Sequence, residues 1–204
     1  MLGKRVISYI DSVVDVISLD TAKKHLESVR TDQDTILTLY LGSAISACSN
    51  YLGFSLRRAI VDYYYTDIEI NYSRARGGLS IPANVLSLTG VYYRTEALTE
   101  TAIDAADYDF WNVEHIPVIK LLETPDSYAN QGWVYKARVI EGYYTQGHGS
   151  GDVRDTMPDD IITAILLTLT HHYENRNDVS IVQTYPLTNG AEHFLYPHSK
   201  LQIL

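Results

Sequence analysis

Residues 158–176 read PDDIITAILLTLTHHYENR, and the spacing of their side chains decides how the chain folds. Pro158 suits the first turn of a helix, because backbone N–H groups there make no hydrogen bond within the helix and proline has no N–H to donate. Side chains of one face then recur every three or four residues, the period of a helix: Ile161, Ile162, Ile165, Leu166, Leu169, His172 and Tyr173. One helix is therefore predicted over residues 158–176, and its mainly apolar stripe needs a partner.

A helical pair near the N-terminus can supply that partner. Ser18 is a good N-cap, with Asp20 in the first turn of the helix that follows. The acidic turn Thr31–Asp34 starts a second, longer helix, which Gly53 ends. Because both helices carry apolar stripes of their own, we expect this hairpin to pack against the helix at 158–176.

The middle third of the chain changes to the alternating period of β-strands. Turn residues separate the candidate strands, which are 59–66, Leu79–Ile81, Val85–Arg94, Tyr108–Val113, Val118–Leu122 and Trp133–Thr145. The predicted fold class is α+β: a helical bundle formed by an N-terminal helical hairpin and a C-terminal helix, with an inserted small antiparallel β-sheet subdomain.

These elements set the predicted domain limits. The chain is predicted to divide into four parts: an N-terminal extension (1–17), a helical core (18–56 with 158–176), an inserted β subdomain (57–157) and a C-terminal docking tail (177–204). Pro186, Gly190 and Pro197 lead us to expect an irregular tail.

The composition limits the function classes. The chain has 204 residues, 17 tyrosines and a net charge of −9, and this acidic balance argues against general binding to a nucleic-acid backbone. Cys48 is the single cysteine, so no intrachain disulfide can form and a buried, unreactive thiol is expected. No apolar run approaches the ~18 residues of a membrane span, and residues 1–20 make a poor signal peptide. We therefore expect an intracellular soluble protein.

The segment THHYENR, residues 170–176, suggests metal or proton chemistry at first sight. However, His171 and His172 lie about 100° apart on a helix, whereas a helical zinc pair needs histidines four residues apart. Position 175 is Asn, so that spacing is absent. The segment is interpreted as a structural helix end, and no catalytic, metal-binding or cofactor-binding residue is assigned. A metal-dependent enzyme using His171, His172 and Glu174 remains an alternative.

Three stretches together resemble one protein family. They are ISLDTAKKHLESVRTDQDTILTLYLGSAISACSNYLGFSL (17–56), MPDDIITAILLTLTHHYENR (157–176) and PLTNGAEHFLYPHSK (186–200). Their order and spacing resemble the head–tail connector (adaptor) proteins of long-tailed bacteriophages and gene transfer agents. The chain departs from the pattern at His172, where an aromatic residue is usual, and at His198, where Tyr is usual.

This resemblance implies a non-enzymatic homo-oligomeric ring, typically of twelve subunits, beneath the portal protein of the capsid. Such a ring extends the DNA channel in the virion neck, lets DNA pass without specific binding, and joins the capsid to a downstream stopper or tail protein. It would assemble in the host cytoplasm, with no membrane and no cofactor involved. The residues expected to contact the portal are Tyr196, Pro197, His198, Lys200, Leu201, Ile203 and Leu204.

The chain could alternatively be a different neck component, such as a stopper or a tail terminator, and this alternative is closer to the adaptor than a metal-dependent enzyme is. Those proteins are mostly β-barrels with little helix, so the two helical regions of this chain favour the adaptor. Deletion of residues 186–204 is expected to leave a folded monomer that no longer joins portal-bearing heads.

Overall fold

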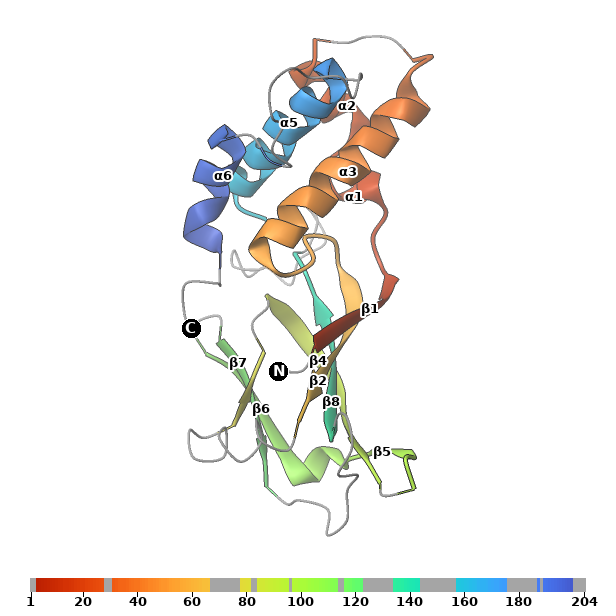
Figure 1. The fold of residues 1–204 in the computed structure, drawn as a ribbon, viewed down its shortest axis with the longest axis vertical. Coiled ribbons are helices and arrows are strands. Elements are labelled where there is room, and N and C mark those ends of the chain that lie inside the picture. The colour runs from red at the N-terminus through yellow and green to blue at the C-terminus, as the bar shows by residue number, and fades with distance from the viewer. Residues whose placement is uncertain are drawn as a thin grey trace. The chain divides into compact units, whose positions relative to one another are not determined.

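The computed structural model describes residues 3–27, 31–66, 78–81, 84–95, 97–113, 116–122, 134–143, 157–175, 187 and 189–199. The chain forms two compact units, each assembled from two separate stretches of sequence (Figure 1). One unit comprises Met1–Ile10 with Arg58–Gly142, and the other comprises Asp11–Arg57 with Tyr143–Leu204.

The first unit is built from antiparallel β-sheets. Its larger sheet has five strands in the order β1 (Gly3–Tyr9), β2 (Ala59–Tyr65), β8 (Tyr135–Glu141), β4 (Val85–Arg94) and β5 (Glu100–Ala102). Its smaller sheet has three strands in the order β3 (Leu79–Ser80), β7 (Ile116–Leu121) and β6 (Tyr108–Val113), and a short 3-10 helix, η1 (Ala105–Asp107), precedes β6. Among these strands, β1 and β5 form the two edges of the larger sheet.

The apolar core of this unit follows from the alternation of side chains along each strand. The residues that β2 and β8 bury include Val61, Tyr63, Tyr65, Tyr135, Ala137 and Val139, and β7 buries Ile119. The Tyr65 hydroxyl donates to the backbone carbonyl of Ser80 at 3.3 Å, which links the larger sheet to β3.

The second unit is helical and contains α1 (Val13–Val16), α2 (Leu19–His25), α3 (Asp34–Leu52), α5 (Asp159–Glu174), α6 (Asn189–Leu195) and the 3-10 helix η3 (Tyr196–His198). The Ser18 side chain accepts a hydrogen bond from the Thr21 N–H, which caps α2. Gly53 ends α3 in the left-handed conformation, with φ of 79°. No helix in the described part of the chain has the length and apolar character needed to cross a bilayer.

The helices α3 and α5 pack through a fully buried seam. The seam residues include Leu41, Ala44, Ile45 and Cys48 from α3 and Ile161, Ala164, Ile165 and Leu169 from α5. Thr168 is the polar residue of this seam. Its hydroxyl donates to the Ala164 carbonyl at 2.8 Å, so the buried hydroxyl keeps a hydrogen-bond partner. Of the stripe predicted from residues 158–176, Ile161, Ile165 and Leu169 are buried. The other four predicted residues are half-buried, and the structure adds Ala164 and Thr168 to the buried face.

The α+β class and the antiparallel strands are confirmed. The predicted helices correspond to α2, α3 and α5, although α2 ends at His25 and is shorter than its apolar pattern suggested. The strand expected over Trp133–Thr145 is shorter in the structure, since β8 covers Tyr135–Glu141.

The structure adds elements at both ends of the chain that the sequence did not predict. Residues 1–17 contain β1 and α1, so this segment contributes to both compact units rather than only preceding them. The tail is not irregular throughout, because residues 189–198 form α6 and η3. Gly190 lies within α6, and a Cβ added there would meet Leu167 at an ordinary contact distance of 3.6 Å. Pro197 falls in η3, after α6 has ended, so neither residue interrupts α6.

Candidate functional site

The C-terminal segment expected to contact a partner is anchored on its own helical unit. Ala191 and Leu195 of α6 are fully buried, and α6 packs against α5. His198 Nε2 lies 3.6 Å from the Asp160 carboxylate in the first turn of α5. Residues 189–199 therefore pack on the chain's own helical unit.

Three of the seven predicted contact residues fall within the described part of the chain. Tyr196 is 59% exposed, Pro197 is exposed and His198 is half-buried. The other four, Lys200, Leu201, Ile203 and Leu204, lie outside the described residues. Among the three described contact residues, Tyr196 is the large exposed aromatic side chain.

The structure also changes the expectation for the deletion of residues 186–204. That deletion would remove α6 and expose the part of α5 against which Ala191 and Leu195 pack. Loss of two fully buried side chains destabilises a small helical unit. The truncated chain is therefore expected to fold poorly, and a shorter deletion is needed to test docking.

The histidines of THHYENR lie at the C-terminal end of α5 and do not assemble a ligand set. The His171 and His172 rings are 6.1 Å apart between centroids and are tilted by 57°. His171 Nδ1 lies 3.1 Å from the Asn175 side-chain nitrogen, and Glu174 is exposed. In the part of the chain that the structure describes, no three His, Cys, Asp or Glu side chains are grouped so as to hold a metal ion.

His172 is half-buried near the end of α5. Its Nε2 is buried and has no hydrogen-bond partner among the described residues. Burial, and to a lesser degree the neighbouring His171, lower the pKa of His172 below its ordinary value of 6.5. The next residue, Tyr173, donates its hydroxyl to Gln33 Oε1 at 2.9 Å and so ties α5 to the start of α3. Arg176 lies outside the described residues.

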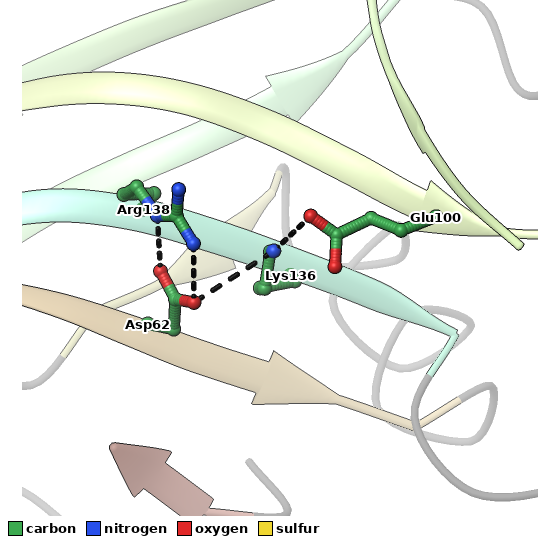
Figure 2. A network of polar contacts seen from close by, with 4 residues as sticks. All are labelled: Asp62, Glu100, Lys136 and Arg138. Atoms are coloured by element: carbon green, nitrogen blue, oxygen red, sulfur yellow. Dashed lines mark hydrogen bonds and ion pairs between the residues drawn. The ribbon is translucent and has the colours of Figure 1, made fainter. Parts of the chain in front are cut away.

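The sequence analysis missed a buried ion network in the five-stranded sheet (Figure 2). Asp62 on β2 accepts two hydrogen bonds from Arg138 on β8, from Nε at 2.7 Å and from Nη2 at 2.9 Å. Lys136 Nζ lies 3.7 Å from the Asp62 carboxylate and also contacts Glu100 on β5. Asp62 and Lys136 are each 2% exposed.

Strand register explains why these charges meet. Asp62 lies directly opposite Arg138, and Lys136 lies directly opposite Tyr92 of β4. The Tyr92 ring covers the Lys136 ammonium, whose nitrogen is 4.2 Å from the ring centroid. The hydrogen bonds to Asp62 raise the pKa of Arg138. Two cations and two carboxylates balance one another, so the network offers no uncompensated charge to a ligand.

A second polar contact joins three strands on the opposite face of β2. The Tyr63 hydroxyl donates to the fully buried Glu141 carboxylate, and Lys4 Nζ of β1 lies 3.6 Å from the same carboxylate. Burial, followed by the charge of Glu141, raises the pKa of the Tyr63 hydroxyl, so it stays a donor. The signal in the sequence was the presence of Asp62, Lys136, Arg138 and Glu141 within the two predicted strands 59–66 and Trp133–Thr145.

Comparison with known proteins gives structural likeness only. No family model and no curated protein matches the sequence. One similar structure is a chain of the "Virion of native gene transfer agent (GTA) particle", with a TM-score of 0.70, 17% identity, and coverage of 98% of this chain and 97% of that chain.

Two further structures are of particle necks. A chain of the "Neck of empty GTA particle computed with C6 symmetry" has a TM-score of 0.71 at 18% identity, covering 99% of this chain and 97% of that chain. A chain of the "Neck of native GTA particle computed with C12 symmetry" has a TM-score of 0.62 at 18% identity, covering 97% and 96%. Because the likeness covers nearly all of each chain, the two compact units have together the fold of these gene transfer agent particle chains.

Proposed function

We propose that this chain is a structural protein of the virion neck, a head–tail connector that forms a ring beneath the portal. One observation carries the proposal: the fold matches a chain of a particle neck with C12 symmetry over 97% of this chain and 96% of that chain. The short motifs shared with connector proteins at both helical regions support the same assignment.

In this proposal the ring has twelve subunits and extends the DNA channel. The helical hairpin and the C-terminal helix form the bundle of each subunit, and the β subdomain completes the ring. The net charge of −9 suits a channel wall, because an acidic surface repels the DNA backbone and lets packaged DNA pass without sticking.

The portal contact is assigned to the end of the chain, with residues 177–204 as the docking tail. Tyr196 and Pro197 are exposed beyond the anchored helix α6, and an exposed Tyr is a common anchor in protein interfaces. The predicted contact set continues through Lys200, Leu201, Ile203 and Leu204. The opposite side of the ring would bind a downstream stopper or tail protein.

The test is to add the purified full-length chain to DNA-filled heads that carry the portal but no neck, and to image the product by electron cryomicroscopy. A ring of twelve copies in contact with the portal is the expected result. Density of this chain only at the far side of another neck protein would favour the stopper assignment. No added density would contradict a neck role.

A further inference from the structure

The strand β1 carries an unusual group of exposed apolar side chains at the edge of the five-stranded sheet. Val6, Ile7, Tyr9 and Ile10, within or just after β1, are 37%, 44%, 51% and 45% exposed. Within the described part of the chain, β2 is the single strand that pairs with β1. Ile10 continues this pairing, since its N–H donates to the Arg58 carbonyl at 2.8 Å.

Edge strands of soluble proteins are normally protected against pairing by charges, Pro residues or shortness. β1 has seven residues and no Pro, and its charges, Lys4 and Arg5, are confined to its first half. The second half, residues 6–10, carries no charge, and a bulge between Val6 and Ser8 is its one protective feature. An exposed apolar strand of this kind is suited to pairing with another strand.

The opposite edge of the same sheet has the complementary charge. Residues 3–10, GKRVISYI, contain two basic residues and no acidic residue. Residues 95–107, TEALTETAIDAAD, include β5 and contain four acidic residues and no Lys or Arg. Leu98, which is 54% exposed, adds apolar surface just before β5. Glu100 already contacts Lys136 and Lys4 lies near Glu141, so the charges that the two edges offer to another copy are mainly those of Asp104 and Asp107 on one side and Arg5 on the other. These opposite charges attract each other when the edges belong to different copies of the chain.

We infer that β1 of one subunit pairs with β5 of the next copy, so that the five-stranded sheet continues from subunit to subunit around the ring. This inference rests on the proposed function, because a ring of subunits that all point the same way needs two different, complementary surfaces on each subunit. A β1–β1 contact would instead be self-complementary and would stop at a dimer.

Sheet topology fixes the direction of the proposed pairing. Each neighbouring pair in the order β1-β2-β8-β4-β5 is antiparallel, so β1 and β5 run in the same direction. A neighbour related by rotation about an axis along the strands would therefore present β5 parallel to β1. Because β5 has only three residues, the ladder is short and assembly should depend on concentration.

Cysteine cross-linking tests the pairing directly. Cys48 is the chain's single cysteine, it is fully buried, and burial raises the pKa of its thiol to about 11, so its background reaction with a maleimide is low. We would prepare Val6→Cys, Thr101→Cys and the double variant, and treat each with a short bismaleimide. A flexible linker tolerates a shift of register, and both positions lie at least partly in solvent.

The proposed pairing gives a distinct result for each sample. The double variant should form a ladder of covalent multimers, the single variants should stay monomeric, and a mixture of the two single variants should stop at dimers. Dimers from Val6→Cys alone would show β1–β1 pairing and overturn the inference. A double variant that yields no multimers, either in concentrated solution or in rings bound to heads, would also overturn it.

A charge reversal provides a second measurement. Arg5→Glu should reduce multimer yield at least several-fold, because it places a carboxylate beside the acidic β5 edge. Lys24→Glu is the matched control. Lys24 is 77% exposed on α2, and this substitution changes the net charge by the same amount as Arg5→Glu. Equal yields from both variants would contradict an edge-to-edge contact. If a twelve-fold ring forms on the portal but the double variant gives no covalent multimers, this inference alone is refuted. If the covalent multimers form but the chain does not bind heads, the proposed function alone is refuted.

Discussion

At the scale of single residues, Asp62 shows how the sheet depends on a buried charge. Its carboxylate holds Arg138 through two hydrogen bonds and lies beside the buried ammonium of Lys136. We expect Asp62→Asn to lower the free energy of unfolding of the β unit by about 3–5 kcal/mol, because removal of one partner leaves buried positive charge uncompensated. Tryptophan fluorescence in urea measures this, since Trp111 lies on β6 of that unit.

The control for Asp62 is an exposed ion pair. Asp20 and Lys24 on α2 form a pair whose side chains are 75% and 77% exposed. Asp20→Asn should cost less than about 1 kcal/mol, because solvent screens both charges. Similar losses in the two variants would show that burial of the network adds nothing.

His172 gives a pH-dependent prediction. Its pKa is lowered in the folded state, so the unfolded chain binds a proton more readily, and stability contributed by the neutral ring is lost as pH falls below about 6.5. We expect His172→Phe to reduce the loss of thermal stability between about pH 7 and about pH 5, because Phe fills the site without titrating. His193→Gln, at an exposed position on α6, should keep the wild-type dependence. Identical pH profiles for His172→Phe and the wild type would contradict this role.

At the scale of elements, two neighbouring residues at the end of α6 allow the folding of the helical unit and its docking to be tested separately. Leu195 is fully buried against the helical unit, whereas its neighbour Tyr196 is 59% exposed. Leu195→Ala should destabilise the helical unit by about 2–5 kcal/mol through the cavity it leaves. Tyr196→Ala should change stability by less than about 0.5 kcal/mol but weaken binding to portal-bearing heads. Circular dichroism melts and a head-binding assay compare the two variants, and unchanged binding by Tyr196→Ala would exclude that ring from the contact.

At the scale of the whole molecule, the end of the chain tests the proposed place in the virion. Deletion of residues 200–204 retains every described contact of α6 and η3, so the melting temperature should stay near that of the full chain. Binding to portal-bearing heads should fall at least about tenfold, or about 1.4 kcal/mol, if these residues contact the portal. Undiminished binding would move the contact elsewhere on the chain.

Sequence periodicity was sufficient for the elements with a strong apolar face. The stripes of residues 158–176 and 34–52 are long, and burial of such a stripe dominates local preference, so α5 and α3 could be predicted. β1 and α6 could not, because each is short and lies near an end of the chain. Their stability comes from pairing with β2 and packing against α5, which are contacts between distant parts of the sequence.

The sequence by itself determined the α+β class and the two long helices α3 and α5, because these depend on the spacing of apolar residues within one element. Tertiary structure alone decided that Asp62, Glu100, Lys136 and Arg138 meet, and that a basic and an acidic edge terminate the same sheet. Those features depend on strand order and register. Both are set by long-range burial, which the local order of residues does not encode.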